Sequence, residues 1–206
     1  MRSVKKTITL ILLTATPLIL LSYFFIDEGV ARFAFAHDAT FSPIFDRLSH
    51  GADSTYWLIA FGLLWLFWKF YKKHEYRAKQ TGFMFIAIVT TGLSVNLIKM
   101  FFGKARPILL KKEEIFGFEW FVPPSAYDYH SFPSGHTTTA FTIATVLTLM
   151  FPRYAISFYL YATAMGISRV LNWNHYVSDV IAGAAFGTIV TILLYQIDKI
   201  SFKNRT

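Results

Sequence analysis

Three short groups of polar residues lie between positions 99 and 179, each at the edge of an apolar stretch. The groups are Lys99 and Arg106; Ser134, Gly135 and His136; and Arg169, His175 and Asp179. Catalysis of phosphoryl transfer depends mainly on positioning and on stabilising the negative charge of the phosphate oxygens, which requires cations and backbone donors. The residue types and their spacing therefore predict a phosphate-transfer site.

Five of these residues are suited to bind the phosphate itself. Arg106 and Arg169 offer guanidinium groups that bind two oxygens at once, and Lys99 offers a compact charge. Ser134 directly precedes a predicted helix, so its hydroxyl and the free N–H groups of the helix start can hold an anion. Gly135 allows the backbone to approach the phosphate closely. We expect these five side chains and backbone groups to surround the phosphate.

The two histidines and the aspartate are suited to the chemical steps. His175 and Asp179 are four residues apart, so on a helix face Asp179 can hold one ring nitrogen and leave the other as a nucleophile. His136 is then free to protonate the leaving oxygen and later to activate water. The same three side chains are also possible metal ligands, but the surrounding cations argue against a bound metal ion. We therefore expect neither a metal nor a cofactor.

The composition places these groups in a membrane protein. Of the 206 residues, 54% are apolar and 16% are charged, which is typical of integral membrane proteins. The absence of cysteine excludes disulfides and thiolate metal sites. The formal net charge is +8, but the basic residues are scattered between apolar runs rather than gathered on one face, which argues against a nucleic-acid partner.

Six apolar runs are candidates for membrane-spanning helices, and they cover 7–26, 55–70, 81–102, 136–151, 154–169 and 176–197. An alternative for the first run is a cleaved signal peptide, with 34–36 as the cleavage site. We prefer a retained span, because the run exceeds the ~7 to 15 apolar residues usual in a signal peptide. The fourth and fifth runs are short for a bilayer about 30 Å thick. Gly183 and Gly187 in the last run predict close helix packing.

The charges flanking the runs predict the topology. The segments before the first run, between the second and third, between the fourth and fifth, and after the sixth are basic, so both termini are expected in the cytoplasm. All three polar groups then fall on the outer face. The segment 27–54 is expected to be an external loop with an interfacial helix and no chemistry. The segment 103–133 is expected to be a long loop that contacts substrate, with its aromatic residues resting on the membrane surface.

Taken together, the three groups resemble the type 2 phosphatidic acid phosphatase superfamily, whose pattern is K-x6-RP, PSGH and SR-x5-H-x3-D. Every fixed position of that pattern is filled here. The resemblance implies a metal-independent phosphatase that works through a phosphohistidine, with His175 as nucleophile, Asp179 as its orienting partner and His136 as general acid. It also implies that the phosphate is bound by Lys99, Arg106, Ser134, Gly135 and Arg169.

The sequence thus predicts an all-α, polytopic helical bundle with about six transmembrane helices, forming one domain over 1–206. The predicted function is hydrolysis of an envelope lipid phosphate at the outer face of the plasma (inner) membrane. The resemblance implies undecaprenyl diphosphate, lipid A and phosphatidylglycerol phosphate as candidate substrates. Two alternatives are a lipid phosphotransferase, in which a second lipid takes the phosphoryl group from His175, and a non-catalytic membrane scaffold that binds phospholipid.

Overall fold

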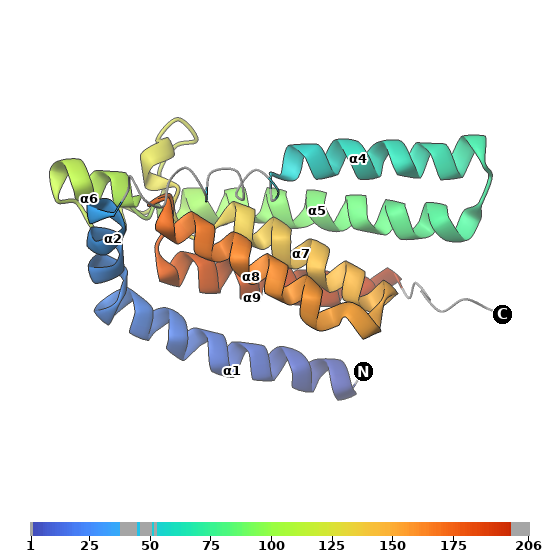
Figure 1. The fold of residues 1–206 in the computed structure, drawn as a ribbon, viewed down its shortest axis with the longest axis horizontal. Helices are drawn as coiled ribbons and strands as arrows, with labels where there is room; N and C mark the ends of the chain where they lie inside the picture. The colour runs from blue at the N-terminus through green and yellow to red at the C-terminus, as the bar shows by residue number, and fades with distance from the viewer. Residues whose placement is uncertain (1, 38–44, 46–50, 52, 199–206) are drawn as a thin grey trace.

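The computed structural model describes residues 2–37, 45, 51 and 53–198, and its regular elements in these ranges are helices (Figure 1). The α-helices are α1 (Arg2–Phe25), α2 (Asp27–Ala36), α4 (Ser54–Leu66), α5 (Glu75–Phe102), α6 (Pro107–Glu113), α7 (Gly135–Met150), α8 (Ala155–Leu171) and α9 (Val177–Asp198). A π-helical turn, η1 (Phe67–Tyr71), continues α4, and two 3-10 turns cover Tyr127–Tyr129 and Pro152–Tyr154. The predicted all-α class is confirmed.

The helices form an elongated bundle (Figure 1). Helices α5, α7, α8 and α9 run along one another, α4 folds back along α5, and α1 lies against α9 on the other side. Helix α7 packs closely on α9, where a Cβ added at Gly183 would lie 2.6 Å from the Ser134 carbonyl oxygen. One added at Gly187 would lie 2.5 Å from the Thr138 carbonyl oxygen. The packing role predicted for these two glycines is confirmed.

Large apolar side chains cover the outside of the bundle. Leu13 on α1 is 68% exposed, Leu63 on α4 is 62% exposed, and Ile156 on α8 is 78% exposed. In the described part of the chain, three helices are long and apolar enough to cross a membrane: Val4–Phe25, Glu75–Phe102 and Val177–Ile197. Helices α7 and α8 have 16 and 17 residues, about 24–26 Å at ~1.5 Å per residue, which is short for a full crossing. The count of six spans therefore stays a prediction.

Two segments differ from what the sequence predicted. Helix α5 starts at Glu75, before the apolar run starts at 81. Hydropathy marks the apolar part of a helix and not its first hydrogen-bonded turn. That turn is capped by His74, whose ring accepts a hydrogen bond from the Arg77 N–H. The expected long loop at 103–133 contains α6, which has Pro107 in its first turn. Several of its backbone groups form hydrogen bonds with one another; for example, the Ser131 N–H donates to the Lys104 carbonyl at 3.0 Å.

The aromatic residues of this segment divide into two sets. Phe116 stacks on Tyr23 of α1, and the ring of Phe118 lies 5.9 Å from that of Phe102, so both pack inside the protein rather than on a membrane surface. Trp120 and Phe121 are 49% and 75% exposed. Trp120 and Phe121 are thus free to rest on a membrane surface, as the sequence analysis expected for the aromatic residues of this segment.

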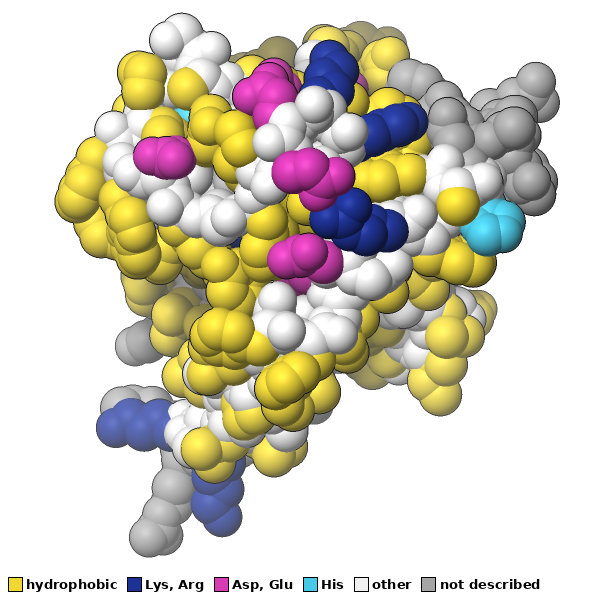
Figure 2. All heavy atoms as spheres, turned by 90° about the vertical axis from the view of Figure 1, so that its left-hand side faces the viewer, with side chains coloured by type: hydrophobic (Ala, Val, Ile, Leu, Met, Phe, Trp, Pro, Cys, Tyr) yellow, Lys and Arg dark blue, Asp and Glu magenta, His cyan; other side chains and the backbone are white. Residues whose placement is uncertain are grey.

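The start of α1 and the end of α9 lie at one end of the bundle, whereas α2, α6 and the 3-10 turn at 127–129 lie at the other (Figure 1). Figure 2 looks onto the second end, where basic and acidic side chains sit among hydrophobic ones. Arg32 forms an exposed ion pair with Glu28 within α2 and another with Glu114, which joins α2 to the end of α6. The expected basic segment after α9 and residues 38–44, 46–50 and 52 of the expected loop at 27–54 lie outside the described residues.

Candidate active site

The end of the bundle that carries α2 and α6 also gathers the three polar groups. Helices α5 and α8 end there and α7 and α9 begin there, so Lys99 and Arg169 lie in last helical turns and His136 and Asp179 in first turns. The sequence prediction that all three groups share one end is confirmed. The outward orientation of that end stays a prediction.

Lys99 points into the protein rather than out to a membrane surface. It is 8% exposed, and its ammonium donates to the carbonyl oxygen of His130 at 2.9 Å. Helix α5 stops one turn later because Gly103 adopts a left-handed conformation, with φ 55°, and caps the helix by donating its N–H to the Lys99 carbonyl. An ammonium has three N–H groups, so two of those on Lys99 remain for a phosphate.

Arg106 lies just before α6 and is 5% exposed. Its guanidinium donates one hydrogen bond each, all at 3.1 Å, to the carbonyl oxygens of Tyr127, Asn174 and His130. The shared acceptor on His130 brings Arg106 and Lys99 together, and the bond to Asn174 brings Arg106 beside His175. Of the five guanidinium N–H groups, two remain for a phosphate.

The start of α7 is bound to the start of α9. Ser134 is fully buried and caps α7, and its backbone N–H donates to the Asp179 carbonyl at 3.0 Å. Its hydroxyl oxygen accepts a hydrogen bond from the Thr137 hydroxyl at 2.9 Å. A Cβ added at Gly135 would lie 3.8 Å from the Lys99 nitrogen. The helix start therefore faces the Lys99 ammonium, as a phosphate cradle requires.

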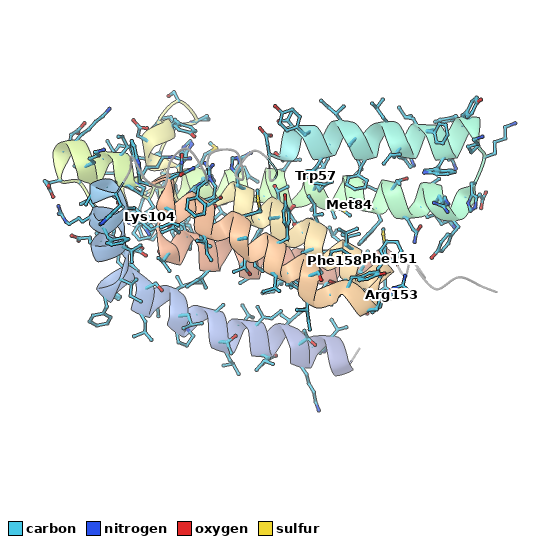
Figure 3. The ribbon with its side chains drawn as sticks, in the orientation of Figure 1. Trp57, Met84, Lys104, Phe151, Arg153 and Phe158 are labelled. Carbon is cyan, nitrogen blue, oxygen red and sulfur yellow. The ribbon has the colours of Figure 1, made fainter. Side chains whose placement is uncertain are left out.

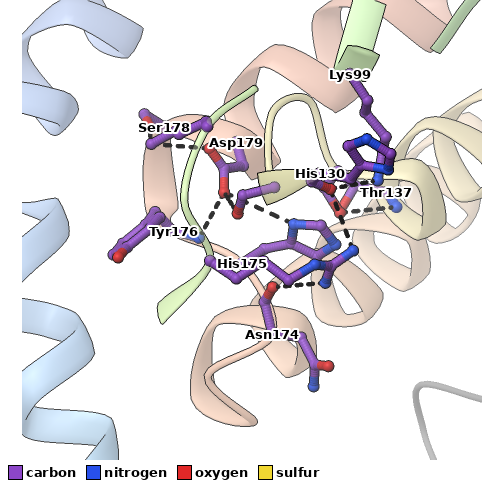
Figure 4. Close-up of polar contacts among 12 residues, drawn as sticks. Lys99, His130, Thr137, Asn174, His175, Tyr176, Ser178 and Asp179 are labelled. Atoms are coloured by element: carbon purple, nitrogen blue, oxygen red, sulfur yellow. Dashed lines mark hydrogen bonds and ion pairs between the residues drawn. The ribbon is translucent and has the colours of Figure 1, made fainter. Parts of the chain in front are cut away.

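His175 lies in the turn before α9, is 2% exposed, and donates its backbone N–H to the Arg169 carbonyl at 3.1 Å. Figure 4 shows its ring directed at Asp179, with Lys99 approaching from the other side. The Nδ1 atom of His175 is 3.7 Å from Oδ2 of Asp179, which is longer than a hydrogen bond. Contacts of this kind often tighten only when substrate is bound. The geometry leaves Nε2 as the ring nitrogen available for attack.

Asp179 is fully buried, and its carboxylate has several donors. Its Oδ2 accepts from the Ser131 hydroxyl at 2.6 Å and from the Tyr176 N–H at 2.9 Å. Its Oδ1 accepts from the Lys104 ammonium at 2.9 Å. These bonds hold the carboxylate in one orientation beside His175.

His136 and Arg169 complete the set of eight predicted site residues. Arg169 is 8% exposed, at the end of α8, and His136 is half-buried in the first turn of α7. The charges of Arg169, Lys99 and Arg106 all act on the His136 imidazole. The other seven residues are linked by hydrogen bonds and close approaches. His136 lies near them because it is in the first turn of α7, and the same three positive charges act on its imidazole.

The sequence analysis missed two residues, Lys104 and Asp27. Both are buried, and the Lys104 ammonium pairs with Asp27 at 2.8 Å and with Asp179 at 2.9 Å. The available signal was weak: Lys104 stands in the spacer of the first motif, and Asp27 directly follows an apolar run. The sequence analysis expected no chemistry in 27–54, and the structure places Asp27 of that segment in a buried ion pair beside the predicted site.

The buried charges at this end do not balance. In the part of the chain that the structure describes, the buried ionic side chains are the cations Lys99, Lys104, Arg106 and Arg169 and the carboxylates Asp27 and Asp179. Formally, two positive charges are left over, which matches the charge of a phosphate monoester dianion. An uncompensated buried charge costs several kcal/mol, so this site favours an anion. A cluster of three or more His, Asp or Glu side chains able to hold a metal ion is not found among the described residues.

Burial lowers the pKa of the His175 imidazole well below its ordinary value, and the charges of Arg106 and Lys99 act in the same direction. Asp179 opposes this shift. A neutral imidazole is the form that attacks phosphorus. The surroundings of His175 therefore keep its imidazole neutral at neutral pH.

A model of the PAP2 superfamily matches residues 80–203 of the sequence. The chain belongs to this superfamily. A relative from Rhizobium etli named lipid A 1-phosphatase is 34% identical over 171 residues, which cover 76% of this chain and 73% of the relative. A protein of the same name from Rhizobium johnstonii is 41% identical over 112 residues, covering 54% of this chain and 45% of that protein.

Two solved structures are similar to this PAP2 chain. The crystal structure of Aquifex aeolicus LpxE has a TM-score of 0.61 and 25% identity and covers 85% of this chain and 98% of its own. A PAP2 type phosphatidylglycerolphosphate phosphatase from Bacillus subtilis has a TM-score of 0.66 and 20% identity over the full length of both chains, which shows a shared fold. The protein is accordingly a multi-pass membrane lipid phosphatase of a metal-independent family.

Proposed function

We propose that this PAP2 phosphatase hydrolyses the 1-phosphate of lipid A, with residues 1–206 acting as one domain. The observation that carries the proposal is the 34% identity to the Rhizobium etli lipid A 1-phosphatase over 73% of that protein. A third relative of the same name, from Porphyromonas gingivalis, is 34% identical over 138 residues, covering 63% of this chain and 27% of the relative. The excess of two buried cations supports a phosphate monoester dianion as the reacting group.

We propose a reaction in which the two histidines act in turn. His175 Nε2 attacks phosphorus, a P–N bond forms, the P–O bond to the lipid breaks, and His136 gives its proton to the leaving oxygen. His136 then takes a proton from water, the water oxygen attacks phosphorus, the P–N bond breaks and inorganic phosphate leaves. The phosphate oxygens are held in both steps by Lys99, Arg106, Arg169, Ser134 and the backbone at Gly135.

We further propose six membrane crossings, by α1, α4 with η1, α5, α7, α8 and α9, with the site on the outer face of the inner membrane. Figure 3 labels Lys104 at the site end of the bundle and Arg153 at the opposite end. Lys5 and Lys6 at the start of α1 and Lys72 beside η1 join Arg153 at that opposite end. This excess of basic residues favours a cytoplasmic location for that end.

An apolar cavity beside α7 supports an amphiphilic substrate. The cavity measures about 90 Å³ and is lined by α7 residues Ala140, Ala144 and Leu147 together with Trp57 of α4 and aromatic residues of α8. These α7 residues follow His136 by 4, 8 and 11 positions, so they continue the helix face on which the imidazole lies. We propose that part of an acyl chain occupies this cavity while the phosphate lies at His136.

The deciding experiment measures phosphate release by the purified protein in detergent with a chelator. The substrates are lipid A with both phosphates, lipid A with only the 4′-phosphate, undecaprenyl diphosphate and phosphatidylglycerol phosphate, and His175→Ala is the control variant. We expect release to be fastest from bisphosphorylated lipid A, with a product that keeps its 4′-phosphate, and to be absent in His175→Ala. Preference for another lipid would contradict the substrate. Binding without release would instead favour a phosphotransferase lacking its acceptor or a scaffold.

A further inference from the structure

The side chain of Lys104 lies in the middle of an ion-pair group behind the catalytic aspartate. Its ammonium donates to Asp27 at 2.8 Å, to the Ser178 hydroxyl at 2.8 Å and to Asp179 at 2.9 Å. All three N–H groups of the ammonium are thereby used. Lys104 therefore has no donor left for a phosphate, unlike Lys99, and its role differs from that of the phosphate-binding cations.

Asp27 is the second acid of this group, and it is bound from two sides. It comes from the first turn of α2, and its Oδ1 accepts from the backbone N–H of Ser178 at 2.9 Å. Its Oδ2 accepts from the Ser178 hydroxyl as well as from Lys104. Asp27 lies outside the segment 80–203 that matches the superfamily model. The N-terminal helices therefore supply a charged residue to a site otherwise built from that segment.

Aromatic rings shield the Lys104 ammonium from water. The nitrogen lies 4.5 Å from the ring centre of Tyr176, 5.1 Å from that of Tyr23, 5.7 Å from that of Phe116 and 5.8 Å from that of Phe118. Lys104, Asp27 and Asp179 have fully buried side chains. Charges in such a dry environment act on one another more strongly than at a surface, so the charge of the whole group matters for His175.

The group carries a formal net charge of −1, from two carboxylates and one ammonium. If Lys104 paired with Asp179 alone, its positive charge would cancel the carboxylate that faces His175. Asp27 compensates Lys104 and leaves one negative charge beside the imidazole. That charge is needed when His175 carries the phosphoryl group, because the ring is then positively charged.

We infer that Asp27 and Lys104 are positioning residues for catalysis: Lys104 holds Asp179 against His175, and Asp27 preserves the negative charge that stabilises the phosphorylated imidazole. The inference rests on the nucleophilic role of His175 in the proposed function. The other charged groups that act on His175 are Lys99 from α5 and Arg106 from the segment before α6. The variants below leave both in place.

The test compares the acid limb of the pH dependence of kcat/KM. Each profile is corrected for the second ionisation of the substrate phosphate, near pH ~6, so that the remaining limb reports protonation of His175 in the free enzyme. Asp27→Asn changes the group charge from −1 to 0, so we expect the limb to move to lower pH by about 1 unit and kcat to fall by about 10- to 100-fold. Glu28→Gln is the matched control. It removes the same charge from the next residue of α2, but that side chain is 51% exposed, so the limb and kcat should stay as in the wild type.

A charge-restoring double variant completes the test. Lys104→Met alone leaves two buried carboxylates without their cation, so it should be the least active and least stable variant. Asp27→Asn with Lys104→Met returns the group to −1, so we expect activity above that of Lys104→Met and a limb near the wild-type position. A double variant less active than Lys104→Met would overturn the inference. If the two residues had only structural roles, each substitution would lower stability and the two losses would add. An unmoved limb in Asp27→Asn would overturn it too.

A water-soluble dioctanoyl phosphatidic acid serves as substrate, so the result does not depend on which lipid the protein prefers. Where turnover is too slow for steady-state kinetics, single-turnover phosphorylation of His175 gives the same limb. A wild-type protein that releases no phosphate from this ester or from the lipid panel would refute the proposed function. An active wild type whose variants show no limb shift and no rescue would refute only the role of Asp27 and Lys104.

Discussion

Asp179 connects two parts of the site, because one of its oxygens faces His175 while the other accepts from Lys104. Asp179→Asn keeps the shape of the side chain, and its amide oxygen can still accept from Tyr176 or Ser131. We expect a folded protein with kcat reduced by roughly 10⁴, by analogy with neutralisation of a triad aspartate. Phosphate release and thermal unfolding in detergent measure the two effects. Wild-type turnover would refute the orienting role of Asp179.

The pH dependence of the reaction should reflect the burial of His175. Protonation of the imidazole blocks its attack, and burial lowers the pKa of this group below the ordinary value of 6.5. The neutral form therefore persists as the pH falls through 6.5, and kcat/KM should decline only at lower pH. Rate profiles from pH 4 to 8 at constant ionic strength, corrected for the second ionisation of the substrate phosphate near pH ~6, test this. A half-maximal rate at pH 6.5 or above would contradict it.

The eight motif residues could be predicted because their types and spacing are constrained by the chemistry of phosphate. Lys104 and Asp27 could not, because their roles depend on a contact between positions 77 residues apart. Lys104 stands only five positions after Lys99, and nothing in its sequence neighbourhood separates a phosphate-binding lysine from one paired with two acids. The distance of 3.7 Å between His175 and Asp179 likewise depends on how α8 and α9 pack.

At the scale of elements, the contact of α7 with α9 positions Ser134 and Gly135, which we propose to bind the phosphate. In Gly183→Ala the new methyl carbon would stand 2.6 Å from the Ser134 carbonyl, so the start of α7 has to shift. We expect a loss of about 1–3 kcal/mol of stability and weaker phosphate binding, measured by thermal unfolding and by product inhibition. Gly92→Ala is the control, because a Cβ there meets nothing within 4 Å. Equal effects of the two variants would contradict the close approach.

The apolar cavity beside α7 gives a second prediction at this scale. Ala144→Phe fills space between α7 and α8. It should therefore raise KM for a lipid with long acyl chains more than KM for dioctanoyl phosphatidic acid. Leu160→Phe on α8 is the control, since that side chain is 65% exposed. A uniform loss on both substrates would show that Ala144 is needed for folding rather than for acyl chains.

Apolar runs located the long helices but not all of their ends. The polar first turns of α5 from Glu75 carry no hydropathy signal, although His74 provides a cap that could have been recognised. Helix α6 is short and carries two lysines in its last turn, so it resembles a loop in composition. Pro107 in its first turn was the available signal.

At the scale of the whole molecule, the start of α1 and the end of α9 lie at the end of the bundle away from the site (Figure 1). We expect reporter fusions at Thr206 and next to Lys112 in α6 to report opposite sides of the membrane, the first cytoplasmic and the second external. A phosphatase reporter active outside and a fluorescent reporter active inside give complementary signals. The reverse pattern would place the active site in the cytoplasm.

The pairing of Asp27 with Lys104 and Ser178 also affects how the chain is made. Asp27 is synthesised early, and its partners follow 77 and 151 residues later. Until α9 is in place, this carboxylate lacks the two hydrogen bonds from Ser178, and Lys104 lacks its second carboxylate, Asp179. Burying charged groups before their partners are present costs several kcal/mol. The ribosome will have completed most of the chain before α2 can dock in its final place, so a chain that lacks α9 cannot form the complete ion-pair group around Lys104.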